Sequence, residues 1–88
     1  MNDVMIEQAE GIEQRARAEI VRSNDLSALE EVRVRYLGKN GQLTQLLRTI
    51  GQAPPDARKL IGQRGNQAKT AIEQALAVRR TELERATA

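Results

Sequence analysis

The residues of this chain that could do chemistry are the basic side chains at its centre. Residues 33–69 carry eight cations against Asp56 alone, a net charge of +7, whereas residues 1–32 carry a net charge of −5. Cations without local partners repel one another and attract phosphate groups, so an anion-binding surface competes with the ordinary alternative of a solvated helix face. The leading candidate contacts are Arg33, Arg35, Lys39 and Arg48, and the wider patch adds Arg58, Lys59, Arg64 and Lys69.

Catalytic chemistry has little support in these residues. The sequence contains no histidine and no cysteine, so the commonest general base and thiolate ligands are missing. Gly38 and Gly41 form a G-x-x-G pair, but Gln42 follows where a phosphate-binding P-loop requires Lys and then Ser or Thr. The pair also matches the clamp of a KH domain, whose sheet has no counterpart here. We therefore predict no catalytic residue, no metal site and no cofactor bound by these 88 residues.

Three residues of the central stretch have a structural and a functional interpretation. Tyr36 is the only aromatic residue, and at helical spacing it is typical of a core anchor with its hydroxyl at the rim. The alternative is that its ring stacks on a nucleic-acid base. Gly38 and Gly41 are expected to serve the backbone conformation of a turn, which would hold Lys39 outward.

Two apolar stripes predict the long helices that position these residues. Residues 3–22 and 55–86 both place apolar side chains at intervals of three and four, the period of one helix face. Both stripes mix Ala or Gly with Ile or Leu, which lets two backbones approach closely, notably at Gly65 and Ala68. We expect these helices to pair as an antiparallel, coiled-coil-like hairpin.

The middle of the chain predicts two shorter helices. Residues 26–37 and 42–50 have helical spacing, with Gly38 as a stop between them. A β-hairpin over residues 32–43 is the alternative, because Val32 to Tyr36 alternates and Asn40-Gly41 is a hairpin signal. Whether this segment is helix and turn or hairpin stays open at this point.

The helix lengths lead to an expected architecture. At about 1.5 Å per residue, the last helix exceeds the first by roughly 15 Å, and the short helices are available to cover the difference. We therefore predict an all-α single domain over residues 1–88, an antiparallel hairpin with two short helices and the basic residues at its distal tip. The longest uncharged run, Asn40 to Leu47, is far shorter than the ~20 apolar residues of a membrane span. We expect a cytoplasmic protein without membrane contact.

The motif Tyr-Leu-Gly-Lys-x-Gly-x-Leu-Thr at residues 36–44 resembles the start of the alpha subunit of bacterial phenylalanyl-tRNA synthetases. The surrounding residues extend the resemblance over nearly the whole chain: Asp25-Leu26-x-Ala28-Leu29-x-x-Val32-Arg33 before the motif, then Pro55-x-x-Arg58 and Gly62-x-x-x-Asn66-x-x-Lys69. It is weakest over residues 1–22. Asn40 departs from the family, which often has a second lysine there, and this lowers the local density of cations.

The resemblance implies a helical arm that contacts tRNA away from the acceptor end. It also implies that a longer enzyme, of which this chain would be a fragment, joins phenylalanine to its tRNA with ATP and Mg²⁺. That enzyme would pair two alpha with two beta subunits and carry its class II catalytic core outside these residues. The function predicted is a tRNA-binding accessory arm of phenylalanine–tRNA ligase. The alternative from another class is a helical module for protein–protein interaction or self-association through the apolar stripes.

Overall fold

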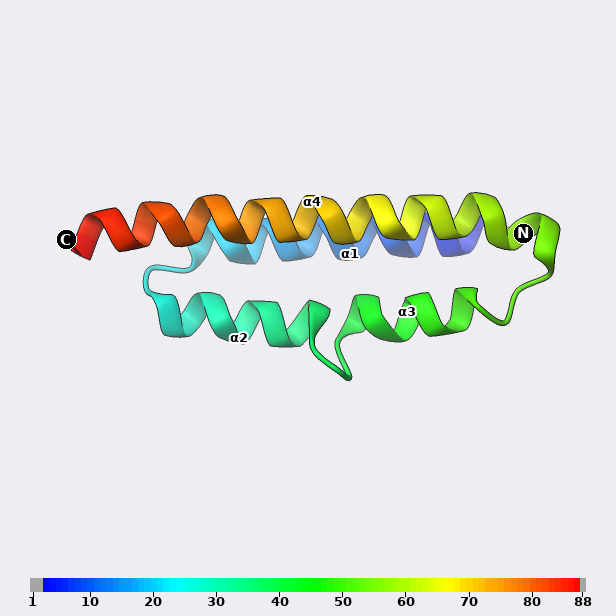
Figure 1. The fold of residues 1–88 in the computed structure, drawn as a ribbon, viewed down its shortest axis with the longest axis horizontal. Coiled ribbons are helices and arrows are strands. Elements are labelled where there is room, and N and C mark those ends of the chain that lie inside the picture. The colour runs from blue at the N-terminus through cyan, green and yellow to red at the C-terminus, as the bar shows by residue number, and fades with distance from the viewer. Residues whose placement is uncertain (1–2, 88) are drawn as a thin grey trace.

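The computed structural model describes residues 3–87, which form an elongated all-α bundle of 49 × 18 × 14 Å (Figure 1). Its helices are α1 (Asp3–Arg22), α2 (Leu26–Leu37), α3 (Gln42–Ile50) and α4 (Pro55–Thr87). The helices predicted from the sequence are confirmed to within one residue at every end. No strand occurs within residues 3–87, so the β-hairpin alternative is wrong. None of these helices combines the length and the apolar character needed to cross a membrane.

The helix ends follow from local signals. Asp25 caps α2 by accepting a hydrogen bond from the backbone N–H of Ala28 at 2.7 Å, which satisfies a free donor of the first turn. At the end of α1 the Ser23 hydroxyl donates to the carbonyl oxygen of Glu19 at 2.9 Å. Pro55 opens α4, where its missing N–H removes no helical hydrogen bond. Such signals lie within a few residues of the ends they determine, which is why the boundaries were predictable.

The turn between α2 and α3 needs its two glycines for lack of space. Both Gly38 and Gly41 have φ of −67°, which any residue can adopt, so a permissive backbone is not the reason. A Cβ on Gly38 would lie 2.5 Å from the Val34 carbonyl oxygen, and a Cβ on Gly41 would lie 2.6 Å from that of Tyr36. The turn is therefore closed by backbone packing that side chains would prevent.

The directions of the helices correct the predicted hairpin. Glu13 of α1 pairs with Arg64 of α4, and the carbonyl of Ser23, just beyond α1, accepts a hydrogen bond from Arg79, so residue numbers rise together along both helices. α1 and α4 thus run in the same direction, whereas α2 and α3 run the opposite way beside them (Figure 1). The antiparallel partner of α4 is the α2–α3 pair, and the predicted pairing of the first and last helices as an antiparallel hairpin is wrong.

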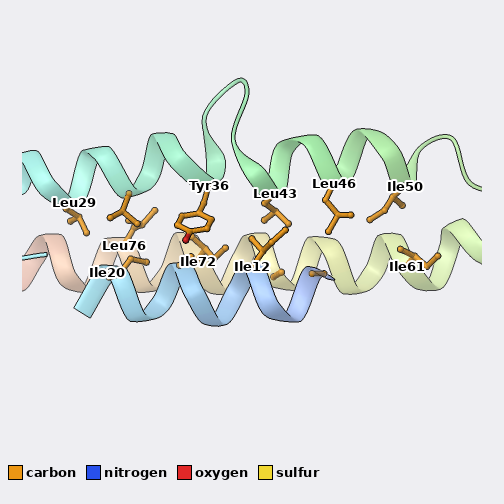
Figure 2. Close-up of a cluster of buried hydrophobic side chains, with 14 of the residues drawn as sticks. Ile12, Ile20, Leu29, Tyr36, Leu43, Leu46, Ile50, Ile61, Ile72 and Leu76 are labelled. Atoms are coloured by element: carbon orange, nitrogen blue, oxygen red, sulfur yellow. The ribbon is translucent and has the colours of Figure 1, made fainter. Parts of the chain in front are cut away.

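The apolar faces of the short helices explain this difference. Leu29, Tyr36, Leu43 and Ile50 are all at most 3% exposed, so both short helices bury a full stripe. With 12 and 9 residues, α2 and α3 together span roughly 30 Å at 1.5 Å per residue. A stripe of that length is buried only when the helices lie along the bundle. Figure 2 shows these side chains directed from α2 and α3 toward α1 and α4.

The close approach predicted at Gly65 occurs, but with α3 as the partner. A Cβ on Gly65 would lie 2.7 Å from Leu47 Cδ2 and 3.3 Å from Ile50 Cδ1. Ala68, one turn further along α4, is completely buried. Small residues on α4 therefore let α3 sit close to it, which brings the basic residues of these two helices near one another.

Candidate nucleic-acid interface

The fold distributes the eight predicted cations over different parts of the bundle. The α2–α3 turn, which carries Lys39, stands out at mid-length (Figure 1), whereas Arg58 and Lys59 lie in the first turns of α4 at one end. Arg58 Nη1 donates to the Gly51 carbonyl oxygen at 3.2 Å and so holds the α3–α4 connection. The predicted cationic tip is wrong, because the short helices lie along the bundle and not across its end.

Two of the predicted contacts are neutralised by carboxylates of α1. Arg35 forms an ion pair with Glu19, and Arg64 Nη1 lies 3.1 Å from Glu13 Oε1. The Arg64 and Glu13 side chains are 25% and 15% exposed, so this pair is partly withdrawn from water. These arginines join α1 to α2 and to α4. We therefore assign Arg35 and Arg64 to the structure of the bundle.

Tyr36 is a core residue, which confirms the first of its two interpretations. Its side chain is 1% exposed and lies in the core between Leu29 and Leu43 (Figure 2). The hydroxyl donates a hydrogen bond to the Glu19 carboxylate, the same group that holds Arg35. Burial, and then the hydrogen bond to Glu19, raise the pKa of the Tyr36 hydroxyl above its ordinary value. A ring in this position has no face free for stacking on a base.

Three of the predicted cations come together in one groove. Lys39 from the turn, Arg48 from α3 and Lys69 from α4 line a solvent-open groove of about 440 Å³. We call it the basic groove; its remaining lining is Leu37, Gly38, Leu43, Thr44 and Leu47. No carboxylate is among these residues. The groove thus brings together cations that are separated by up to 30 positions in the sequence.

The cations of the basic groove are available to an external anion. Arg48 Nη2 donates to the Lys39 carbonyl oxygen at 2.9 Å, which ties α3 to the turn, yet Arg48 forms no ion pair within the described chain. Lys39 and Lys69 have neither a hydrogen bond nor an ion pair from their side chains in residues 3–87. Free ammonium groups beside a guanidinium suit phosphate oxygens, which accept charge-assisted hydrogen bonds. The arrangement can bind phosphate groups.

A second groove continues from the first and contains a basic residue that was not predicted. Arg33, Lys69 and Arg80 line it, together with Leu37, Glu73, Leu76 and Ala77. Leu37 and Lys69 belong to both grooves, so the two form one continuous surface. Arg80 follows Lys69 by 11 residues, about three helical turns, and that spacing was a signal for a shared face. Unlike the basic groove, this second groove has an acidic residue, Glu73, in its lining.

The side chains of the two apolar stripes are buried inside the bundle. Ala9, Ile12, Ala16 and Ile20 of α1 are at most 6% exposed, and Ile72 of α4 is completely buried. Self-association through these stripes would require the bundle to open. Within residues 3–87, therefore, neither stripe is left free for the predicted alternative of pairing between chains.

Comparisons with known proteins match this chain to one family. The model of the class II aminoacyl-tRNA synthetase N-terminal domain matches residues 24–88, a range that contains both grooves. No solved structure matches the chain.

Several curated relatives are phenylalanine–tRNA ligase alpha subunits. The chain is 53% identical to that of Thiobacillus denitrificans over 62 residues, which are 70% of this chain and 18% of the relative. It is 48% identical to that of Vibrio campbellii over 71 residues, 81% of this chain and 22% of the relative. For Geobacillus thermodenitrificans the identity is 42% over 80 residues, 91% of this chain and 23% of the relative. The matched region thus spans about a fifth of the relatives' length.

Proposed function

The chain belongs to the family of class II aminoacyl-tRNA synthetase N-terminal domains, and its relatives include phenylalanine–tRNA ligase alpha subunits. From this membership we propose that the chain is a tRNA-binding arm. The function of this arm is to bind tRNA through its phosphate backbone, while the rest of a longer enzyme aminoacylates the tRNA. The identity of the anion comes from the names of the relatives. The geometry of the bundle supports the basic groove as the proposed place of contact.

The observation that carries the proposal is the basic groove without a carboxylate. Lys39, Arg48 and Lys69 reach it from three separate segments, and none of them forms an ion pair inside residues 3–87. At physiological ionic strength charges interact over about 8 Å, so the carboxylates nearest to a cation decide its availability. By that criterion Arg35 and Arg64 are not available to bind phosphate, because each is paired with a carboxylate. The basic groove remains the strongest candidate site for phosphate binding.

The arm positions tRNA and leaves recognition of its sequence to other parts of the enzyme. Contacts to phosphate fix register and orientation but carry no direct base information. The one aromatic ring, Tyr36, is buried and cannot take part in stacking. The lining of the basic groove, with lysine, arginine and aliphatic side chains, is suited to the backbone of a folded RNA.

The proposal extends to the longer protein to which such a domain belongs. There the alpha subunit would work with a beta subunit, as two copies of each, and join phenylalanine to tRNA with ATP and Mg²⁺. We place that chemistry outside the residues described here, because the two grooves support tRNA binding as the role of this chain. A cytoplasmic location follows from this assignment and remains a prediction.

Titration with a transcript of phenylalanine tRNA at several salt concentrations tests the proposal. Three phosphate contacts correspond to a slope of log affinity against log salt of about −2.7. Replacing Lys39, Arg48 and Lys69 together with Gln is expected to remove most of that slope. The control replaces Arg15, Arg22 and Arg85 with Gln, which removes the same charge at positions that line neither groove. Equal losses in both triple variants would show that the groove is not the contact.

A further inference from the structure

Two arginines that line the second groove from facing helices share the carboxylate of Glu30, which is not itself part of the groove lining. Oε1 of Glu30 accepts a hydrogen bond from Arg33 Nε at 2.8 Å, and Oε2 of Glu30 lies 3.9 Å from Arg80 Nη2. Arg33 belongs to α2 and Arg80 to α4, so the carboxylate bridges the two walls. Each oxygen of Glu30 faces one guanidinium, an arrangement that a phosphate group could also adopt.

Arg33 and Arg80 are the next cations that an RNA backbone would meet if it continued from the basic groove into the second groove. Lys69 lines both grooves, and Arg33 and Arg80 line the second with it. Without the Glu30 carboxylate, the five cations that line the two grooves would have no ion pair within residues 3–87, and Glu73 would be the one carboxylate in the lining. Glu73 is the acidic residue in the lining of the second groove, and it forms no ion pair in residues 3–87. Glu30 is therefore the group that occupies the two arginines.

We propose that Glu30 is an internal competitor for RNA phosphate, which withholds Arg33 and Arg80 and so limits the phosphate contact to the basic groove. The inference rests on the proposed tRNA-binding function and names a determinant of its extent. The three side chains are 42–54% exposed, so an RNA phosphate can reach both guanidinium groups but must displace the Glu30 carboxylate to bind them. Replacing the Glu30 carboxylate with a neutral amide removes the anion that both guanidinium groups share.

The lowered pKa of Glu30 agrees with this arrangement. The hydrogen bond from Arg33 is the largest cause of that shift, and the charges of Arg33 and Arg80 add to it. The carboxylate is thus ionised throughout the neutral range. A limited contact has a physical use, because each added phosphate contact strengthens binding to every nucleic acid alike. Withholding two arginines keeps the arm from binding unrelated duplexes tightly.

The test compares Glu30→Gln with Glu31→Gln in the 88-residue chain. Both variants remove one negative charge at neighbouring positions of α2, but Glu31 forms no ion pair in the described part of the chain. The probe is a phenylalanine tRNA transcript, titrated between about 50 and 200 mM salt. We expect Glu30→Gln to bind roughly three- to tenfold more tightly at the low-salt end and to steepen the salt slope by about one to two. Glu31→Gln should change affinity less than about twofold and leave the slope unaltered.

A second set of variants ties the gain to the two arginines. In a background with both Arg33→Gln and Arg80→Gln, the change Glu30→Gln should no longer increase affinity or slope. Helix content by circular dichroism, measured for each variant, reports whether the bundle is retained. If a variant unfolds, Glu30→Asp, whose shorter carboxylate cannot bridge both walls, is measured in its place and is expected to show part of the gain.

The outcomes separate this inference from the proposed function. If the wild-type chain binds tRNA through Lys39, Arg48 and Lys69 while Glu30→Gln behaves like Glu31→Gln, the competitor role is overturned and the arm remains. If neither the wild type nor Glu30→Gln binds tRNA at low salt, both proposals fall. A gain that persists without Arg33 and Arg80 would overturn the competitor role, because those side chains would not be its source.

Discussion

The α1 side of the bundle and the basic groove both contain basic side chains, but these side chains have different roles in the two regions. On the α1 side Arg35 and Arg64 meet the carboxylates of Glu19 and Glu13, and they join helices. In the basic groove no carboxylate belongs to the lining, and Lys39 and Lys69 form no ion pair within residues 3–87. The difference teaches that the role of a cation depends on what another helix brings beside it. The number of cations in a segment does not reveal that role.

The largest expected effect comes from removing a core side chain that bonds to the α1 side of the bundle. Tyr36→Ala removes a fully buried ring that also carries the hydrogen bond to Glu19, and we expect a loss of about 3–5 kcal/mol in the free energy of unfolding. Urea denaturation followed by circular dichroism measures it. Phosphate binding should fall only to the extent that the chain unfolds. A loss below about 1 kcal/mol would contradict the placement of Tyr36 in the core.

The next effect concerns the turn that carries Lys39. Gly41→Ala forces a Cβ against the Tyr36 carbonyl, and overpacking of this kind costs about 1–3 kcal/mol. Because the turn positions Lys39, tRNA affinity should fall as well. Gly11→Ala is the matched control: its Cβ would meet only the Arg15 guanidinium, at 3.3 Å, and alanine favours a helix interior by up to about 1 kcal/mol. If both variants were equally stable, the backbone packing of the turn would be disproved.

A pH titration sharpens the account of the α1 side. The pKa of Tyr36 is raised in the folded chain, so between its unfolded and folded values the native state binds more protons. The contribution of Tyr36 to the stability of the fold is therefore fully present below pH ~10, and it should be lost as pH rises through the folded pKa. Tyr36 is the sole tyrosine, and its phenolate absorbance reports it directly. The decline should be smaller in Tyr36→Phe; an identical decline in that variant would assign it to other groups.

The smallest effect compares two neighbours on α4. Arg64→Gln removes the ion pair with Glu13 and should lower the free energy of unfolding by about 0.5–1 kcal/mol, with little change in tRNA affinity. Lys69→Gln should do the opposite, leaving stability unchanged and reducing the salt slope by about one. Thermal melts and the tRNA titration read both variants. Were the two indistinguishable in both measurements, the division between a structural side and a binding groove would be lost.

The candidate site was partly predictable from the sequence. The excess of cations between residues 33 and 69 identified Lys39, Arg48 and Lys69, and the 11-residue spacing from Lys69 to Arg80 was available as well. The neutralising partners were not visible in this way. Glu13 lies 51 positions from Arg64, and Glu19 lies 16 from Arg35, so no local pattern could reveal either pair.

The helices themselves were determined by the sequence, whereas their arrangement was decided by the tertiary structure. Caps such as Asp25, stops such as Gly38 and a period of three and four residues act over one or two turns, so they are readable along the chain. An apolar stripe shows which face is buried but not which helix covers it. Only the folded bundle settled that, because the long faces of α2 and α3 had to be buried along α4. This arrangement made α1 parallel to α4, and it separated the paired arginines from the basic groove.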